Sequence, residues 1–486
     1  MEQAEVAIVG AGPAGLAAAA LLAEHGADVV VIDERPRAGG QIYRQPPESF
    51  GGEGLPPGRS YAAGRALLAA AGASGLRWQT RTLAWGLFEP QDAGPVPEGA
   101  AAAWVVALAD DGGIRRLAAR HVLICAGAYD LPVAFPGWTL PGVMTAGGVQ
   151  AFVKSEKLLP GRRFVLAGAH PLLLTVADQL LHAGAELAAV VFAQPAPRLS
   201  EGAAVAMRLR GRLTPVLELV GPLRRLRRHK VPLLFSHLLR AAEGEGALEA
   251  VRVAPISPGW RFVPGAELRF ACDTLAFGYG FVPSTELPRQ AGCSHRWKPR
   301  EGGWVTEHDD WMRTSRAGIS VAGETTGIGG AEQAAEEGRL AALGLLRELA
   351  RLDRGQAARA AAPVRRRLRR RRALSGLVQD RFEPVYGALG ALADDATVVC
   401  RCEEVTAGTV RSALATHPHL GTADAVKLLT RVGMGPCQGR FCMLTVASLI
   451  AEATGRELAE VGAFHARPPA KPLPLWQLAT AWSDPS

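Results

Sequence analysis

Four cysteines late in the chain are spaced so that their thiolates could bind iron. Cys400 and Cys402 form one close pair, and Cys437 and Cys442 form a second in a glycine-rich segment. If a helical hairpin brings the pairs together, each pair can hold one iron of a [2Fe-2S] cluster. Zinc more often uses pairs separated by two residues, and unmetallated thiols are a further alternative. We predict a [2Fe-2S] cluster bound by these four cysteines.

A glycine turn near the start of the chain has the spacing of a dinucleotide site. The stretch "GAGPAG" supplies Gly10, Gly12 and Gly15 between an expected strand and an expected helix. The first glycine permits a sharp turn, the second lets a pyrophosphate approach the backbone, and the third packs helix against strand. Asp33 ends the next expected strand, where a carboxylate can accept ribose hydroxyl groups. These residues predict a bound dinucleotide.

Two further segments resemble flavoproteins that have two dinucleotide-binding domains. "DERPRAGGQIYR" places Gly40 just beyond Asp33, as in the double-glycine stretch of those proteins. In "SVAGETTG", Gly323 and Glu324 stand where such flavoproteins carry Gly-Asp, whose acidic residue meets the ribityl chain of the flavin; the glutamate here is one carbon longer. The resemblance implies that the first site holds FAD.

The second glycine turn, by contrast, lacks two of the three glycines of the motif. It reads "GAHPLL", in which Gly168 is followed by His170 and Leu173 at the second and third glycine positions. A histidine side chain obstructs the approach of a pyrophosphate to the backbone. The following strand ends at Ala193 rather than at a ribose-binding carboxylate. We therefore predict that this domain is a scaffold without productive NAD(P)H binding.

The composition is that of a globular chain without a membrane span. Of its 486 residues, 48% are hydrophobic and 21% charged, and no long apolar run is free of charge. The number of cysteines, seven, is odd, which argues against a disulfide framework. Met1 is not followed by a basic leader, so we expect a cytoplasmic protein. Association with the inner membrane through a complex is an alternative. A thiol-disulfide reductase function is disfavoured because no cysteine pair lies near the flavin segments.

The net charge of +8 is concentrated in residues 224–230 and 365–372. Neither run is interleaved with aromatic residues that could stack on bases, so we predict no nucleic-acid binding. Solvated helix faces, a linker, or a surface for an acidic partner explain the two runs better.

The expected architecture is α/β, with two doubly wound, glutathione-reductase-like dinucleotide-binding domains and a small, mainly helical C-terminal [2Fe-2S] domain. The expected divisions are residues 1–135 with 271–350 for the FAD domain, 136–270 for the second domain, 351–395 for an arginine-rich linker, 396–462 for the cluster domain, and 463–486 for a proline-rich tail. The prolines predict an extended tail rather than a helix.

Nearly the whole chain resembles one family of heteromeric enzymes. "CRCEEVTAGTV" and "KLLTRVGMGPCQGRFC" are similar to the bacterioferritin-associated-ferredoxin type of [2Fe-2S] domain. Its place behind a "GGQIYR" flavoprotein body resembles the A (α) subunits of bacterial opine oxidases and hydroxyproline dehydrogenases. Subunits of cyanide-forming glycine dehydrogenase, dye-linked proline dehydrogenase and heterotetrameric sarcosine oxidase look like more distant relatives.

The resemblance implies an electron-transfer subunit with no catalytic side chain of its own. An amino-acid-oxidase-like β subunit would oxidise an amino or imino acid such as hydroxyproline, proline or an opine, and this chain would deliver the electrons to a downstream acceptor. The resemblance also implies two alternatives for the cofactors, namely ATP in place of FAD and an additional FMN at the subunit interface. The alternative functions are a stand-alone NAD(P)H-dependent flavoprotein reductase and a nucleotide-binding assembly protein.

Overall fold

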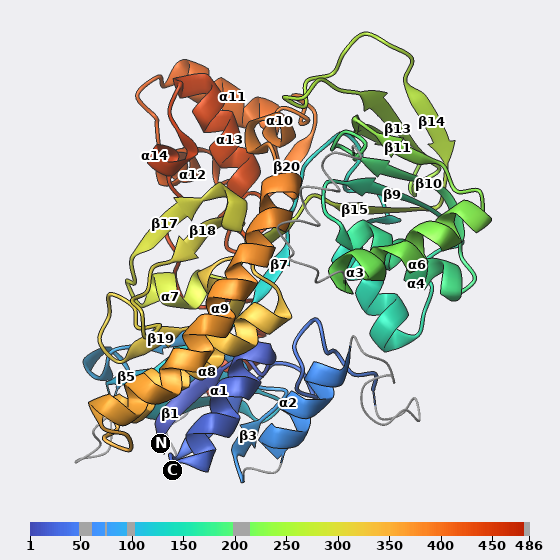
Figure 1. The fold of residues 1–486 in the computed structure, drawn as a ribbon. Coiled ribbons are helices and arrows are strands. Elements are labelled where there is room, and N and C mark those ends of the chain that lie inside the picture. The colour runs from blue at the N-terminus through green and yellow to red at the C-terminus, as the bar shows by residue number, and fades with distance from the viewer. Residues whose placement is uncertain (48–60, 73–74, 95–102, 198–213, 481–486) are drawn as a thin grey trace. The chain divides into compact units, whose positions relative to one another are not determined.

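A computed structural model describes residues 1–47, 61–72, 75–94, 103–197 and 214–480. The chain divides into two compact units, whose elements are labelled in Figure 1. Unit 1 comprises Met1–Tyr129, Val282–Gly376 and His465–Ser486, and unit 2 comprises Asp130–Phe281 and Leu377–Phe464. Each unit is therefore assembled from segments that are distant in the sequence.

Unit 1 is built on a seven-stranded sheet in the order β3-β2-β1-β6-β5-β4, with β19 also pairing with β6. The strands are β1 (Glu2–Val9), β2 (Val29–Ile32), β3 (Arg77–Gln79), β4 (Leu83–Phe88), β5 (Trp104–Asp110), β6 (Gly113–Ile124) and β19 (Ile319–Val321). The strands β3, β2, β1, β6 and β19 pair in parallel, whereas β5 pairs antiparallel with β6 on one side and with β4 on the other. A short antiparallel hairpin, β17 (His295–Lys298) with β18 (Gly303–Thr306), and α7 (Glu286–Gln290) belong to the same unit.

The central strand β1 is buried on both faces, as expected of parallel sheets covered on each side. Val6 and Ile8 belong to a core that includes residues of α1 (Pro13–Glu24) and α8 (Ala331–Glu348). Ala7 and Val9 belong to a second core on the opposite face. In Figure 1, α1 and α8 run side by side, followed by α9 (Arg354–Phe382). A shorter helix, α2 (Ala62–Gly72), lies beside α1.

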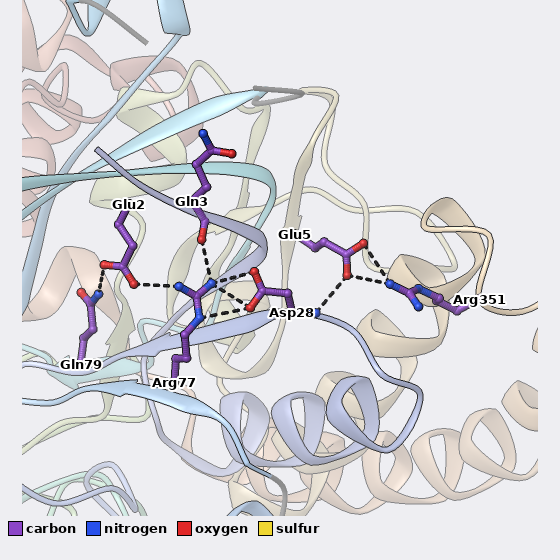
Figure 2. A network of polar contacts seen from close by, with 7 residues as sticks. All are labelled: Glu2, Gln3, Glu5, Asp28, Arg77, Gln79 and Arg351. Carbon is purple, nitrogen blue, oxygen red and sulfur yellow. Dashed lines mark hydrogen bonds and ion pairs between the residues drawn. The ribbon is translucent and has the colours of Figure 1, made fainter. Parts of the chain in front are cut away.

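A polar network joins the N-terminal ends of the parallel strands β1, β2 and β3 (Figure 2). The Arg77 guanidinium donates to Asp28 Oδ2 at 2.7 Å, to Glu2 Oε1 at 2.9 Å and to the Gln3 carbonyl at 2.7 Å. Glu5 accepts from the Asp28 amide at 2.9 Å and from Arg351 at 3.1 Å. These contacts tie β1 to the start of β2, to β3 and to the segment between α8 and α9.

Unit 2 contains a five-stranded parallel sheet and a three-stranded antiparallel sheet, in the orders β11-β10-β9-β15-β8 and β12-β13-β14. The strands are β8 (Val143–Thr145), β9 (Arg163–Gly168), β10 (Glu186–Phe192), β11 (Leu233–Phe235), β12 (His237–Glu243), β13 (Ala250–Pro255), β14 (Leu268–Ala271) and β15 (Thr274–Gly278). The helices α3 (Ala146–Ala151), α4 (Leu172–His182) and α6 (Thr214–Arg228) accompany the larger sheet.

The C-terminal part of unit 2 is mainly helical. It consists of α10 (Tyr386–Gly390), β20 (Val398–Cys400), β21 (Val405–Thr406), α11 (Ala407–Thr416), α12 (Ala423–Thr430), α13 (Met443–Thr454) and α14 (Leu458–Val461). The helix α13 forms its core, because its residues from Met443 to Ile450 are all buried. Thr406 and Thr422 cap α11 and α12 by accepting hydrogen bonds from backbone amides one turn later.

The proline-rich tail is extended only in its first part. The Ala470 amide donates to the Trp85 carbonyl at 2.7 Å, so this stretch lies along β4. After the last proline of this stretch, α15 (Leu475–Thr480) forms, and the prediction that the tail contains no helix is wrong there. The physical reason is that every residue after Pro474 in this helix has a backbone N–H, and the Gln477 amide donates to the Pro474 carbonyl at 3.0 Å. Residues 481–486 of the tail lie outside the described part.

Candidate functional site

The glycine turn between β1 and α1 is shaped by two positions that exclude any side chain. Gly10 has φ +105°, and a Cβ there would lie 2.3 Å from the Cys125 carbonyl oxygen, just after β6. A Cβ on Gly15 would lie 1.9 Å from the Gly10 carbonyl oxygen. Both obstacles are backbone atoms, which cannot move aside as a side chain can. The turn and the start of α1 therefore have one compatible geometry.

Gly12 and Gly40 form a bare surface at the N-terminus of α1. Around Gly12 a Cβ would have only the Gly40 Cα within 4 Å, at 3.8 Å, whereas Gly40 has φ +61° and its Cβ would lie 2.9 Å from the Gly12 Cα. Gly12 is the N-cap residue of α1. The free amides of a helix N-terminus beside a side-chain-free surface suit a pyrophosphate.

Asp33 lies beside this surface, directly after β2. Its Oδ2 accepts a hydrogen bond from the Ala11 amide at 2.7 Å and its Oδ1 accepts one from the Arg35 amide at 2.8 Å. Burial raises the pKa of the Asp33 carboxyl, while the two amides lower it. The carboxylate is thus held in place by the glycine turn, and its remaining lone pairs can accept ribose hydroxyls.

Gly323 and Glu324 begin a short turn of 3-10 helix, Gly323–Thr326, after β19. Gly323 has φ +75°, and a Cβ there would lie 3.0 Å from the Ala14 Cβ of α1. This contact brings the turn to the same end of the sheet as the first glycine turn. Glu324 Oε1 accepts from the Gly330 amide at 3.2 Å, and burial raises the pKa of its carboxyl.

These residues fit a bound dinucleotide. The structure brings together Gly10, Gly12, Gly15, Asp33, Gly40, Gly323 and Glu324 at the C-terminal ends of β1, β2 and β19. Ligands of doubly wound sheets bind at this edge. The Thr325 hydroxyl is fully buried at this turn and has no hydrogen-bond partner among the described residues, so it is a polar group that a ligand could satisfy.

Glu337 contributes to this site and was missed by the sequence analysis. It lies on α8, and its Oε2 accepts from the Gly323 amide at 3.1 Å and from Thr326 Oγ1 at 2.9 Å. The signal in the sequence was the acidic pair in the middle of "AEQAAEEGRLAA", an otherwise small and apolar helix face. The contact itself depends on the packing of α8 beside the turn, which spacing alone does not reveal.

In unit 2, the turn between β9 and α4 is occupied by a histidine. His170 Nδ1 accepts a hydrogen bond from the Leu172 amide at 3.2 Å, and the ring lies edge-on to Phe281 with centroids 4.9 Å apart. Burial lowers the pKa of His170 to about 4, so the ring is neutral at physiological pH. The imidazole thus takes up an amide at the helix N-terminus, where a pyrophosphate would otherwise bind. Leu173 is fully buried and Ala193 is buried at the end of β10.

The four C-terminal cysteines approach one another as two pairs of thiols. Interaction with the Cys442 side chain lowers the pKa of Cys400 to about 6, and interaction with Cys400 raises the pKa of Cys442, whose thiol donates to the Gly439 carbonyl at 3.9 Å. Cys402 interacts in the same way with Cys437, although burial is the main cause of its raised pKa. The chain between the two sequence pairs forms α11 and α12.

The four cysteines are a donor set that a two-iron cluster can use. A [2Fe-2S] cluster takes four thiolates, two on each iron. Gly435 packs directly against one of these cysteines, because a Cβ there would lie 2.2 Å from the Cys402 Cβ. The donor set is therefore suitable, and these cysteines would hold the cluster.

Arg401, between the first two cysteines, is fixed by contacts within unit 2. Its guanidinium lies over the Trp138 ring at 4.5 Å and donates to the Trp138 carbonyl at 3.3 Å. The Trp138 indole in turn donates to the Val398 carbonyl at 2.6 Å. A positive charge is thereby held beside the predicted cluster ligands.

Comparison with known families matches two models to this chain. Residues 4–338 match the pyridine nucleotide-disulphide oxidoreductase family, and residues 398–452 match the BFD-like [2Fe-2S] binding domain. The first match covers the segments with both glycine turns and the Gly323–Thr326 turn. The second begins at β20 and includes all four clustered cysteines.

Similar proteins extend along nearly the whole chain. The opine oxidase A subunit of Rhizobium meliloti is 36% identical, over 97% of each chain. The hydrogen cyanide synthase subunit HcnB of Pseudomonas protegens is 34% identical, over 96% of each chain. The crystal structure of L-proline dehydrogenase from P. horikoshii has a TM-score of 0.66 at 21% identity, covering 98% of this chain and 80% of that one. At that identity, the structural similarity describes the fold alone.

Proposed function

This chain belongs to the pyridine nucleotide-disulphide oxidoreductase family and carries a BFD-like [2Fe-2S] binding domain, and from that premise we propose that it is an electron-transfer (α) subunit. Its complex would oxidise an amino or imino acid, namely hydroxyproline, proline or an opine-like secondary amine. The substrate site would lie on an amino-acid-oxidase-like β subunit, and a downstream acceptor would take the electrons.

One observation carries this proposal: a dinucleotide cradle and a four-cysteine group occur in one chain whose second dinucleotide turn is filled by His170. When bound, FAD and the cluster supply two-electron and one-electron chemistry, respectively. The chain's own residues bind and orient these groups. Gly10, Gly12, Gly15, Gly40 and Gly323 leave room for the dinucleotide, Asp33 and Glu324 accept its hydroxyls, and Cys400, Cys402, Cys437 and Cys442 hold the cluster.

The similar proteins support a heteromeric complex because their names describe subunits of opine oxidase and of hydrogen cyanide synthase. The oxidase-like partner and the downstream acceptor of this chain are parts of the proposal. No helix in the described ranges is both long enough and apolar enough to cross a bilayer.

The test is to purify the chain anaerobically, alone and together with an amino-acid-oxidase-like protein from the same genome. Acid extraction followed by chromatography distinguishes FAD from ATP at the first site and reveals any FMN that appears only in the complex. Low-temperature EPR after dithionite reduction should give a rhombic [2Fe-2S] signal that C437S abolishes.

The complex should then oxidise secondary amines, and this chain alone should not. Colourless protein containing zinc would contradict the electron-transfer function. Rapid reduction of the flavin by NADH or NADPH would contradict the role assigned to His170 and favour a stand-alone reductase.

A further inference from the structure

Glu337 is a carboxylate in an unusual environment. Its residue is only 1% exposed, and Glu336 beside it is also buried. A buried charge is strongly destabilising unless hydrogen bonds and an opposite charge compensate for it. The groups that contact Glu337 must therefore supply that compensation.

Two of those contacts are with the turn at the dinucleotide site, and the other two are with side chains of α8 and α9. One carboxylate oxygen accepts from the Gly323 amide and from Thr326 Oγ1, at 3.1 and 2.9 Å. The other accepts from Gln333 Nε2 and from the Arg372 guanidinium, each at 3.1 Å. Glu337 thus fixes both ends of the Gly323–Thr326 turn and receives its countercharge from α9.

Arg372 belongs to a series of contacts between α9 and α8. Arg367 donates to Glu336 Oε1 at 2.9 Å, and Ser375 Oγ donates to Gln333 Oε1 at 2.9 Å. Arg371 is also paired with Glu332. The arginine run is therefore partly neutralised within unit 1, and its register places Arg372 against the one glutamate that reaches the turn.

The charge of Glu337 also reaches the neighbouring groups. Burial and the nearby Glu337 both raise the pKa of the Cys125 thiol, behind Gly10. Besides burial, Glu337 contributes to the raised pKa of Glu324. A carboxylate that perturbs groups on both sides of the cradle acts on a redox group bound there through the same field.

We propose that Glu337 is a positioning residue that holds the flavin-contacting turn, and that Arg372 of α9 balances its charge at the flavin. The redox equilibrium of the flavin then depends on how α9 is seated on α8. This inference rests on the proposed function, because it requires FAD at the first site. The helix α9 continues beyond residue 376 into the segment that leads to the cluster domain.

The test compares three variants of the full chain at pH 8: E337Q, R372Q and R369Q. Arg369 is exposed on the same helix, and no ion pair of its side chain is found among the described residues, so R369Q is the matched control. Spectroelectrochemistry gives the flavin midpoint potential, flavin fluorescence gives the fraction released, and the EPR signal shows that the cluster is retained.

Removing the negative charge should favour the reduced flavin, and removing the positive charge should disfavour it. We expect E337Q to raise and R372Q to lower the equilibrium constant for reduction by about tenfold each, about 30 mV for a two-electron couple. R369Q should change this equilibrium constant less than twofold. R372K keeps the positive charge and should have a value close to that of the wild type.

Shifts of E337Q and R372Q in the same direction would indicate only a loosened turn and would overturn the proposal, as would shifts no larger than that of R369Q. If E337Q does not fold, the sign of the R372Q shift decides. Wild-type protein without FAD would instead contradict the proposed function itself, so the two failures are distinguishable.

Discussion

Gly15 shows how little freedom the first turn leaves to a single residue. Substitution by alanine would put a Cβ 1.9 Å from a backbone oxygen. We expect G15A to lower the free energy of unfolding by about 3 kcal/mol or more, or to prevent folding of unit 1. Gly72, at the end of α2, is a matched control because nothing lies within 4 Å of its Cβ position. G72A should be neutral or stabilising by up to about 1 kcal/mol in chemical denaturation. Equal losses in the two variants would refute this account of the turn.

His170 should make unit 2 sensitive to acid. Its pKa is about 4 in the folded protein because of burial, against about 6.5 for an exposed histidine. The unfolded chain therefore binds the proton first, and stability present above pH 6.5 is lost as the pH falls towards 4.

Between pH 7 and pH 4.5, H170Q should lose about 2 kcal/mol less stability than the wild type, measured by urea denaturation. H229Q removes an exposed histidine of the same unit and should follow the wild type. A parallel pH dependence in all three proteins would show that His170 is not held neutral.

Residues of the site differ in how well their roles can be predicted from the sequence. The glycines at 10, 12 and 15 were predictable because their spacing is a local motif of the chain, even though the atoms that approach Gly10 and Gly12 come from distant segments. Glu337 was not, since its partners at Gly323 and Arg372 meet it only after α8 and α9 pack. The residues predicted to bind the dinucleotide and the cluster lie together in two groups, and their ligand-binding roles stay predictions.

At the scale of elements, α15 is the best test of how the tail is held. Gln477 is buried, and its Nε2 donates to the Asp110 carbonyl at 2.8 Å. We expect Q477A to lower the unfolding free energy of unit 1 by about 1 kcal/mol, because it removes a buried hydrogen bond. Leu475, which is 82% exposed, begins the same helix, and L475A should have little effect. A larger loss for L475A than for Q477A would mean that α15 is held differently.

The arginine-rich segment illustrates what charge patterns leave open. Residues 365–372 were interpreted as a solvated face, a linker or an acidic-partner surface. The structure shows one long helix, α9, in which Arg367, Arg371 and Arg372 face glutamates of α8. The sequence contained both partners, but which arginines pair depends on the register between two helices, and no local rule sets that register.

At the scale of the whole molecule, the cradle and the cysteines lie in different compact units. We therefore expect C437S to lose the cluster signal while keeping the flavin content of the wild type, measured by absorbance and by extracted FAD. C272A, which changes a buried cysteine of unit 2 outside the four-cysteine group, should keep both cofactors. Loss of flavin from C437S alone would show that the two units do not bind their cofactors independently.

The predicted fold class, two dinucleotide-binding domains with a small helical [2Fe-2S] domain, is confirmed by the family matches and by the fold similarity. It was predictable because each strand-turn-helix unit leaves a local pattern. The sequence analysis expected the FAD domain to be made from two distant segments, whereas it did not foresee that the tail from His465 groups with unit 1 and that Leu377–Phe464 groups with unit 2.

The backbone contact between Ala470 and Trp85 has a consequence for how the protein is made. A ribosome adds about 5–20 residues per second, so Trp85 waits for its partner for a time on the order of tens of seconds. Throughout that interval the nascent unit 1 lacks its closing segment, while all of unit 2 is translated. Until residue 470 has been translated, the strand β4 therefore lacks this backbone contact.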